Sequence, residues 1–326
     1  MEGDIFAYIE LKDTSVRKVS YEVLSAGRKL RDTFSSKLFA VVIGFGVDPL
    51  KDELKKYADS VIVVDDEVFK EFTLDTYSSA LYDLVQKFEP SVILGSHTGY
   101  SKFILPKVSG ILDWAILADL TGFETEKERI LFRKPLFGGR VISFVEVKDG
   151  KKMVLTFRPN SFSVSEPGLA GEVRAERVEV KKDERVRFLS SQKKEGKKAD
   201  LQEADFIICG GRGMKSPENF KILEEIAEIM GGRVGASRSV VDAKWRDYEE
   251  QIGKSGKTVS PVLYIGCGVS GAIHHTMGID TSKTIVAINS DPNAPIFSIA
   301  DYGIVDDLFV ILPILKEELK KAKEEV

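Results

Sequence analysis

Glycine-rich segments that follow apolar runs are the residues of this chain best suited to chemistry, because they can bring backbone N–H groups against a phosphate. The best formed is segment 266–271, Gly-Cys-Gly-Val-Ser-Gly, a G-x-G-x-x-G spacing that follows the apolar run 261–265 and precedes a stretch compatible with a helix. Glycine permits the tight turn, and the positive end of the following helix favours a pyrophosphate. The spacing alone also marks ordinary strand-to-helix turns. With this context, we expect a phosphorylated ligand, most simply a dinucleotide.

Two arginines stand where strands are expected to end. Arg212 lies between glycines in segment 210–213, after a predicted strand that ends at Cys209, and Arg238 follows a predicted strand that ends at Ala236. Open α/β sheets bind ligands at the carboxyl ends of their strands. We therefore predict that Arg212 faces phosphate and that Arg238 shares the same rim. A well-capped turn would explain the glycines but not an arginine held between them.

Segment 253–258, Gly-Lys-Ser-Gly-Lys-Thr, contains two pairs similar to the end of a P-loop. A Walker A motif needs a glycine five residues before its Gly-Lys pair, and Tyr248 and Gln251 occupy the two positions where that glycine would stand. The segment is therefore either a solvated loop or a ligand loop that offers N–H groups, hydroxyls and ammonium groups. Its spacing does not separate the two.

His274 and His275 are adjacent on a predicted helix that begins near Ser270. Adjacent residues on a helix point about 100° apart, so the pair cannot form one metal-binding face, and we expect no metal site. One of the two could reach a ligand across the helix start. Asp291 lies 20 residues after Gly271, the usual offset of the ribose-binding carboxylate in a Rossmann unit. These residues suggest FAD or NAD without distinguishing them.

Composition narrows the class of protein. Lys plus Arg number 47 and Asp plus Glu 51, a net charge of −4, so no basic face marks a nucleic-acid partner. The start lacks a basic segment followed by an apolar stretch, and the apolar run 308–315 is short and broken by Pro313, so we expect a cytoplasmic protein without membrane insertion. Only Cys209 and Cys267 are present, which excludes a disulfide framework or a cysteine-held iron–sulfur cluster within this chain. Both thiols are most simply core residues.

The first half predicts a covered parallel sheet, with apolar runs that alternate with helical periodicity. The expected strands are 5–11, 38–45, 60–64 and 91–95, and the expected helices are 21–33, 74–88 and 102–112. Between 122 and 164 the runs are closely spaced and β-rich, including 140–147 and 153–158, with turn signals at Gly138-Gly139 and Asp149-Gly150. We interpret them as antiparallel strands that complete the first domain.

A second α/β alternation follows a charged stretch. In residues 181–200, 12 of 20 side chains are charged, and this stretch is the best linker candidate. The expected strands beyond it are 204–209, 233–236, 262–265 and 284–289, and the expected helices are 217–230, 270–277 and one from 307. We therefore predict two domains, 1–195 and 196–326.

Five ordered segments resemble the signature of electron-transfer flavoprotein alpha subunits. They are 210–213, 235–238, 251–257, 270–275 and 288–297, followed by 300–303. The likeness is specific from about 204 to 312 and looser in the first domain, where 155–160 and 95–112 are also similar. It implies an adenine-nucleotide-hydrolase-like first domain that contacts a beta subunit and holds no nucleotide. It also implies a doubly wound, Rossmann-like (deoxyhypusine-synthase-like) second domain that holds FAD.

The resemblance also implies a set of FAD contacts. Arg238 would stabilise the anionic reduced flavin and raise its potential, Ser255 would donate to the N5 edge of the ring, and His275 would lie near the pyrimidine carbonyl. The implied contacts are Arg212, Ser237, Arg238, Gln251, Ile252, Gly253, Lys254, Ser255, Ser270, Gly271, Ala272, Ile273, His274, His275, Asn289, Asp301 and Tyr302.

Three positions depart from the family pattern or from the spacing argument. His274 stands where the family usually has glutamine, which leaves its role open, and Ser255 replaces a threonine, which keeps the hydroxyl. The Rossmann offset favours Asp291 as the ribose ligand, whereas the family assigns that role to Asn289 and Asp301. We follow the family and expect Asp291 to form a turn.

The implied function is that of an FAD-carrying electron shuttle. Electrons would come from an acyl-CoA or related dehydrogenase, as in fatty acid β-oxidation. They would leave singly to a quinone-linked oxidoreductase or to another dehydrogenase. A membrane-bound acceptor could recruit the protein to the membrane. In a close alternative, a bifurcating FAD in the beta subunit takes hydride from NADH, so catalysis would belong to the complex.

Two other hypotheses remain open. One is an NAD-dependent enzyme on a deoxyhypusine-synthase-like Rossmann domain, with Lys254 or Lys257 as the reactive lysine. The other is a nucleotide-sensing module based on the first domain, which has no glycine-rich loop beyond 44–46.

Overall fold

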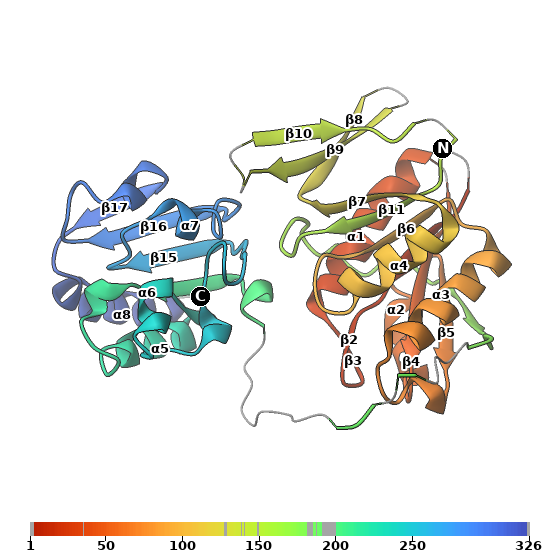
Figure 1. Cartoon of the computed structure of the whole chain (residues 1–326), viewed down its shortest axis with the longest axis horizontal. Helices are drawn as coiled ribbons and strands as arrows, with labels where there is room; N and C mark the ends of the chain where they lie inside the picture. Colours follow the sequence, from red (N-terminus) through yellow and green to blue (C-terminus); the bar gives the residue numbers. More distant parts are fainter. Residues whose placement is uncertain are drawn as a thin grey trace. The chain divides into compact units, whose positions relative to one another are not determined.

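The computed structural model describes residues 3–34, 36–126, 129–137, 139, 141–148, 150–180, 185–186, 188–190 and 200–324. It forms two compact units, Met1–Pro135 with Ile142–Lys193 and Leu136–Val141 with Lys194–Val326 (Figure 1). Most of the predicted linker 181–200, and the turn residues Gly138 and Asp149, lie outside the described residues. Within the described residues, no helix has the length and apolar character needed to cross a membrane.

The first unit contains a sheet of seven parallel strands in the order β12-β5-β4-β1-β6-β11-β7. The strands are β1 (Ile5–Tyr8), β4 (Leu38–Gly44), β5 (Ser60–Asp65), β6 (Val92–Ser96), β7 (Ala115–Leu120), β11 (Met153–Phe157) and β12 (Glu172–Ala175). A short antiparallel hairpin, β2 (Leu11–Lys12) and β3 (Ser15–Val16), follows β1. The central strands read as continuous apolar runs because helices cover both faces.

Alternate residues of the central strands pack into two separate cores. Ile5 and Ala7 pack with residues of α1 (Lys18–Phe34), whereas Phe6 and Tyr8 pack with residues of α3 (Leu74–Phe88) and α4 (Ser101–Leu112). The short α2 (Lys51–Leu54) precedes β5. The period of two along each strand therefore divides the core between the faces, as expected for a covered parallel sheet.

The prediction for residues 153–158 was wrong in direction. These residues form β11, which pairs in parallel with both β6 and β7. The preceding residues leave the main sheet and form a small sheet of β8 (Gly122–Glu126), β9 (Arg129–Leu136) and β10 (Val141–Val145), in which β8 and β9 are antiparallel as expected (Figure 1). The chain then returns to the main sheet as β11, parallel to its neighbours. The prediction failed because closely spaced β-rich runs do not indicate the direction of a strand.

The second unit contains five parallel strands in the order β14-β13-β15-β16-β17. They are β13 (Phe206–Gly210), β14 (Arg233–Ala236), β15 (Leu263–Cys267), β16 (Thr284–Asn289) and β17 (Tyr302–Val305). The helices are α5 (Phe220–Ile229), α6 (Arg238–Asp242), α7 (Ile273–Thr276) and α8 (Leu308–Glu324). The order 2-1-3-4-5 confirms the predicted doubly wound, Rossmann-like class, and the strand order reverses between β13 and β15.

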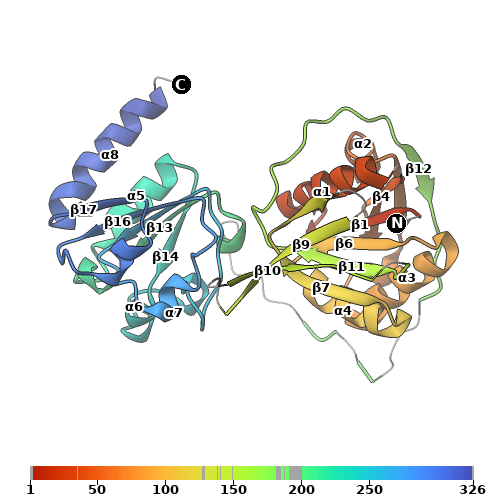
Figure 2. The ribbon, with the colours of Figure 1, turned by 90° about the horizontal axis from the view of Figure 1, so that it is seen from above.

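The two faces of this second sheet are covered differently. Helices α5 and α8 pack on one face through Phe220, Leu223 and Leu312 (Figures 1 and 2). The other face packs against irregular segments through Ile252, Val259 and Ile296. Two of the segments predicted to bind a ligand, 251–257 and 288–297, thus contribute residues to the core on this side of the sheet.

Candidate functional site

The segments that follow β13 and β15 meet at the point where the strand order reverses. The N–H of Gly211 donates to the carbonyl of Cys267 over 2.9 Å, and the N–H of Gly213 donates to the carbonyl of Gly268 over 3.1 Å. A Cβ at Gly211 would lie 2.1 Å from the carbonyl oxygen of Gly268, so this approach requires glycine. The two glycine-rich turns predicted from the sequence therefore form one assembly at the switch point of the sheet.

Segment 251–257 joins this assembly through two backbone hydrogen bonds. The N–H of Ile252 donates to the carbonyl of Ala236 over 3.0 Å, and the N–H of Lys254 donates to the carbonyl of His274 over 2.7 Å. Gly253 has φ +130, and a Cβ there would lie 2.5 Å from the carbonyl oxygen of His274. The segment is thus a compact turn fixed between the end of β14 and α7.

Segment 269–274 is anchored at its carbonyl groups and leaves its N–H groups available. Val269 accepts from the side chain of Asn289 over 2.9 Å, and Ser270 accepts from the N–H of Ile296 over 3.0 Å. Within the described part of the chain, the backbone N–H groups of 269–274 donate no hydrogen bond. Gly271 has φ +80, and a Cβ there would lie 2.3 Å from the nitrogen of Ile296. Free N–H groups ahead of a helix favour an anion.

The residues of the predicted FAD-binding set differ in exposure. The exposed ones are Arg212, Arg238, Lys254, Ser255, Ser270, Ala272, Ile273, His274, Asp301 and Tyr302, the buried ones are Ser237, Gln251, Ile252, Gly253, Gly271 and His275, and Asn289 is half-buried. The side chain of Arg238 is 68% exposed and pairs with Asp242, with Nε 3.4 Å from Oδ2. Exposed pairs of this kind contribute little stability, so the guanidinium can turn to a ligand.

His275 lies in the interior of the unit. It is 7% exposed, and its Nε2 atom lies 2.7 Å from the hydroxyl of Tyr264. Burial lowers the pKa of His275 to about 4, and the backbone of Ile252 opposes that shift only in part. The imidazole is therefore neutral near pH 7, while the neighbouring His274 is exposed.

Strand register separates Asp301 and Tyr302 from the other predicted residues. Tyr302 pairs with Val286 across the strands β17 and β16. The N–H of Ile285 donates to the carboxylate of Asp301 over 2.8 Å. Tyr302 lies three residues and Asp301 four residues before the carboxyl edge, where Asn289 pairs with Val305, or roughly 10 to 13 Å of strand. The structure does not bring them to the edge that Asn289 occupies.

Asp306 and Asp307 are the acidic residues that sequence reasoning missed at that edge. They follow β17, and the N–H of Asp306 donates to the carbonyl of Asn289 over 3.2 Å. Asp291 is confirmed as a turn residue, because its carboxylate accepts from the N–H of Asn293 over 2.9 Å. A short acidic pair beside a strand end carries no spacing signal that would have marked it in advance.

The two cysteines are buried within the sheet of the second unit. Burial raises the pKa of the Cys209 thiol to about 12 and raises the pKa of Cys267 further. Neither thiol is a nucleophile at neutral pH, in agreement with their interpretation as core residues.

The first unit fills its own switch point, which lies between β1 and β6. Glu10 follows β1 and is 2% exposed. Its carboxylate accepts from the N–H of Ser101 at the start of α4 over 2.9 Å, from the hydroxyl of Thr98 over 3.2 Å and from Arg17 over 2.5 Å. A helix start at such a point is suited to a phosphate, and here the chain supplies the anion.

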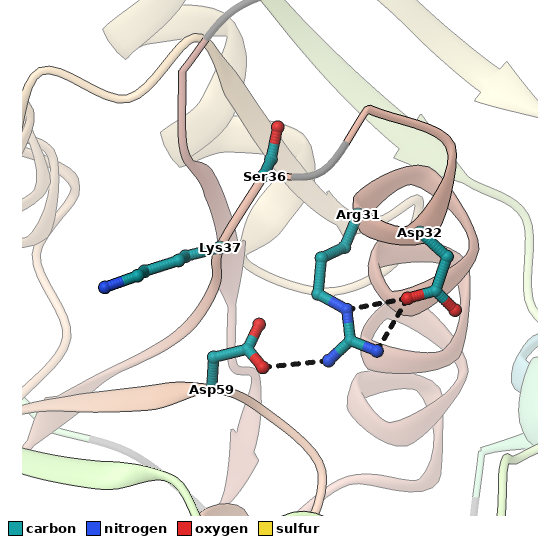
Figure 3. Close-up of a pocket in the computed structure, with 5 residues that line it drawn as sticks. All are labelled: Arg31, Asp32, Ser36, Lys37 and Asp59. Atoms are coloured by element: carbon teal, nitrogen blue, oxygen red, sulfur yellow. Dashed lines mark hydrogen bonds and ion pairs between the residues drawn. The ribbon is translucent and has the colours of Figure 1, made fainter.

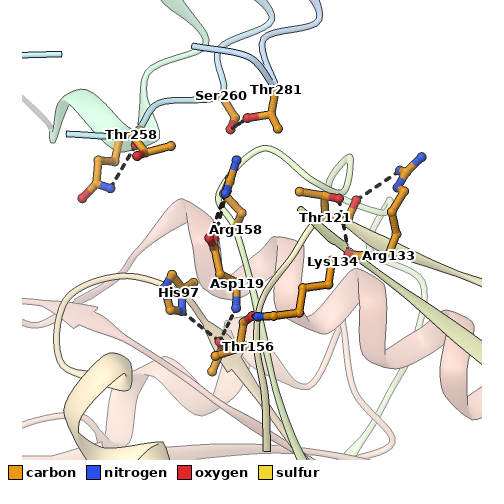
Figure 4. Close-up of polar contacts among 12 residues, drawn as sticks. His97, Asp119, Thr121, Arg133, Lys134, Thr156, Arg158, Thr258, Ser260 and Thr281 are labelled. Carbon is orange, nitrogen blue, oxygen red and sulfur yellow. Dashed lines mark hydrogen bonds and ion pairs between the residues drawn. The ribbon is translucent and has the colours of Figure 1, made fainter. Parts of the chain in front are cut away.

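A second polar cluster lies at the carboxyl ends of β6, β7 and β11 (Figure 4). Arg158 donates twice to the carboxylate of Asp119, over 2.9 and 2.7 Å. The hydroxyl of Thr156 lies 3.0 Å from His97 Nδ1 and accepts from the N–H of Asp119. Burial lowers the pKa of His97 to about 4, against the opposing effect of Asp119. For Asp119 itself burial acts to raise the pKa, and the contacts with Arg158 outweigh it and lower the pKa.

An open depression in the first unit lies at the opposite, amino ends of β4 and β5 (Figure 3). It is lined by Arg31, Asp32, Ser36, Lys37 and Asp59. Arg31 pairs with both Asp32 and Asp59, at 2.6 and 2.9 Å. Because Arg31, Asp32 and Asp59 neutralise one another, we assign no ligand to the depression.

Comparison with known protein families matches both units of the chain. Residues 5–183 match the electron transfer flavoprotein domain, and residues 200–280 match the electron transfer flavoprotein FAD-binding domain.

Individual relatives extend over nearly the whole chain. The chain is 38% identical over 325 residues to the electron transfer flavoprotein subunit alpha of Thermoanaerobacterium thermosaccharolyticum, with 98% of each chain covered. It is 38% identical over 314 residues to that of Bacillus subtilis, with 96% of each covered. It is also 34% identical over 317 residues to the LctC subunit of a lactate dehydrogenase (NAD(+),ferredoxin) of Acetobacterium woodii, with 95% of this chain and 75% of that protein covered.

Proposed function

Because this chain belongs to the family of electron-transfer flavoprotein alpha subunits, we propose that it pairs with a beta subunit and carries electrons on an FAD held by its second unit. A dehydrogenase that acts on an acyl-CoA or a related substrate supplies the electrons. A quinone-linked oxidoreductase or another dehydrogenase takes them singly. Bound FAD supplies this chemistry, since a flavin exchanges both one and two electrons.

The row of available N–H groups in 269–274 is the observation that carries this proposal. Three segments far apart in the sequence are joined by backbone hydrogen bonds around that row, with Ala236 bonded to Ile252 and Lys254 bonded to His274. The glycines at 211, 253 and 271 leave no room for a Cβ. Such a cradle suits the pyrophosphate of FAD, with Arg212 as a further phosphate contact and Asn289 beside it.

Arg238 and Ser255 are the residues we assign to the flavin ring. Both are exposed, and each belongs to one of the joined segments. A guanidinium next to the ring stabilises negative charge that develops on reduction. His275 is neutral and buried, so its part is to hold α7 in place as well as to border the ring. We leave Asp301 and Tyr302 out of this site because of their register.

The first unit is proposed to contact the beta subunit and to bind no nucleotide. Glu10 occupies the helix start that a phosphate would use, and its neutralisation by Arg17 makes the arrangement self-contained. The NAD-dependent enzyme is not retained, because Lys257 is paired with Asp200 at 2.9 Å and family membership accounts for the remaining residues.

Electron bifurcation is a second candidate, favoured by the similarity to LctC, whose name includes NAD(+) and ferredoxin. In that version a second FAD in the beta subunit takes hydride from NADH, and the FAD of this chain serves one branch. A flavin count tests both versions. The chain is co-expressed with its beta subunit, and flavin released from the purified heterodimer is measured by absorbance. One FAD per heterodimer would support the simple carrier, and two would support bifurcation. A heterodimer that contains no FAD would contradict the proposal.

A further inference from the structure

Ser255 is held from two sides by side chains of its own segment. Gln251 donates from Nε2 to the hydroxyl of Ser255 over 3.0 Å. The hydroxyl of Tyr248 donates to the carbonyl of Ser255 over 2.6 Å. Gln251 is 3% exposed, whereas Ser255 and Tyr248 are exposed. A buried amide thus supports an exposed hydroxyl, while the tyrosine supports only the backbone beside it.

The backbone of Gln251 is fixed on several sides, which fixes the direction in which its side chain leaves the main chain. Its N–H donates to the carbonyl of Tyr248 over 3.0 Å, and its carbonyl accepts from the N–H of Lys257 over 2.7 Å. It also forms a parallel bridge with Ala236 at the end of β14. A Cβ at Gly256 would lie 2.3 Å from the carbonyl oxygen of Gln251, so the turn closes tightly around this residue.

The support from Gln251 decides which hydrogen bonds the Ser255 hydroxyl can make to a ligand. A serine hydroxyl can accept two hydrogen bonds and donate one. Gln251 fills one accepting position, and the Ser255 hydroxyl makes no other hydrogen bond with the described residues. Its own hydrogen therefore stays available to a ligand. Were the amide turned over, its oxygen would accept that hydrogen and Ser255 could no longer donate outward.

We propose that Gln251 is a positioning residue, which holds the Ser255 hydroxyl as a hydrogen-bond donor to the flavin without contacting the flavin through its own side chain. This inference rests on the proposed function, since it takes FAD to be the ligand of the second unit. It assigns to Gln251 a role different from the direct FAD contact that the family resemblance implies. A buried amide that only supported the fold would have no reason to govern a flavin property.

The Gln251→Glu variant tests the proposal, because an ionised carboxylate only accepts hydrogen bonds and would take the Ser255 hydrogen. The full-length chain is prepared with its beta subunit and FAD, and the flavin absorption spectrum and reduction potential are measured from pH 6 to pH 9. Ser255→Ala is the reference for loss of the donor. Tyr248→Phe is the matched control, since it removes a hydrogen bond to Ser255 but leaves the hydroxyl.

We expect Ser255→Ala to shift the spectrum and potential at every pH. Gln251→Glu should reproduce at least half of that shift at high pH, as its carboxyl ionises, and lose it at low pH. Addition of Ser255→Ala to Gln251→Glu should then cause less than half of its wild-type shift at high pH, and Tyr248→Phe should behave as the wild type. A wild-type flavin signal in Gln251→Glu at all pH values, or additive effects of the two substitutions, would overturn the proposal.

If Gln251→Glu loses FAD, Gln251→Met carries the test, because methionine has a similar length and does not orient the hydroxyl. In that background the effect of Ser255→Ala should fall to less than half, and an undiminished effect would overturn the inference. Failure of the proposed function looks different, because the wild-type complex would then contain no FAD.

Discussion

The two parallel sheets of this chain reverse their strand order in the same way but use the resulting space differently. In the first unit, Glu10 occupies the space and accepts from the N–H at the start of α4. In the second unit, segment 269–274 keeps its N–H groups available among the described residues. The same sheet geometry therefore provides a filled structural site in one unit and, in the other, unbonded N–H groups that we propose bind FAD.

The comparison shows that strand order alone predicts where a ligand could bind but not whether one does. What decides is the residue that stands after the first strand of each sheet. A carboxylate after β1 supplies the negative charge that the helix start attracts, whereas glycines after β13 and β15 supply none and allow close approach.

Replacement of Glu10 should have the largest effect. Glu10→Ala removes the carboxylate that Arg17, Thr98 and Ser101 all contact, and loss of one member of a buried pair costs about 3 to 5 kcal/mol. The free energy of unfolding of the first unit, measured in urea, should fall by that amount. Glu172→Ala is the control, because that side chain is 77% exposed. A change below about 1 kcal/mol for Glu10→Ala, as small as a surface substitution, would show that the first switch point is not filled in this way.

Acid should weaken both units through one histidine in each, whose pKa is lowered by desolvation. The pKa of His97 and that of His275 are lowered to about 4 in the folded state, while the unfolded value is about 6.5. The unfolded chain therefore binds more protons between these values, so stability is full above pH 6.5 and falls as the pH is lowered toward 4. Each histidine contributes on the order of 3 kcal/mol over this window.

Urea unfolding between pH 7 and pH 4.5, together with proton NMR of the imidazoles, checks this expectation. The resonances of His97 and His275 should not titrate between pH 5.5 and pH 8. Titration of either one near pH 6.5 would mean that its ring is open to water. The two units would then not share a histidine with a lowered pKa.

Close approach at the second switch point can be tested at Gly271. A Cβ there would lie 2.3 Å from the nitrogen of Ile296, so Gly271→Ala should displace segment 269–274 and weaken FAD binding at least about tenfold, equivalent to 1.4 kcal/mol. Gly231→Ala is a matched control, since Gly231 also has positive φ but its Cβ would meet nothing within 4 Å. Equal FAD affinity of the two variants, measured by flavin fluorescence, would count against the cradle.

Replacement of Arg238 should have the smallest of these effects. Arg238→Ala removes an exposed guanidinium and should lower the potential of the bound flavin by about 60 mV, a tenfold change in a one-electron equilibrium. Lys320→Ala removes the same charge from α8 and should leave the potential unchanged. An unchanged potential in Arg238→Ala would remove this residue from the ring.

Much of this fold could be predicted from the apolar runs of the sequence and the turn residues that separate them. The predicted strands 233–236 and 284–289 and the predicted helix 74–88 coincide with β14, β16 and α3, because continuous apolar runs or a helical period mark each of them. β12 was missed because it is an exposed edge strand. The direction of β11 was wrong because burial patterns do not record direction.

The site was less predictable than the sheet that carries it. Glycines and strand ends located the segments, but the bonds between them depend on three-dimensional packing. Glu10 lay inside a predicted apolar strand, where one acidic residue gives no sign of its partners. The hydrogen bond from Gln251 to Ser255 is likewise a matter of side-chain direction, which residue types alone do not specify.

Amide hydrogen exchange in the full complex, with and without FAD, tests the central claim most directly. We predict that the amides of 269–274 exchange rapidly without FAD and at least about tenfold more slowly with it, since bound N–H groups are protected. The amides of His97 and Ser101, which donate to the carbonyl of Phe157 and to Glu10, should be protected in both states. Unchanged exchange in 269–274, or new protection of these two amides on FAD addition, would contradict the account.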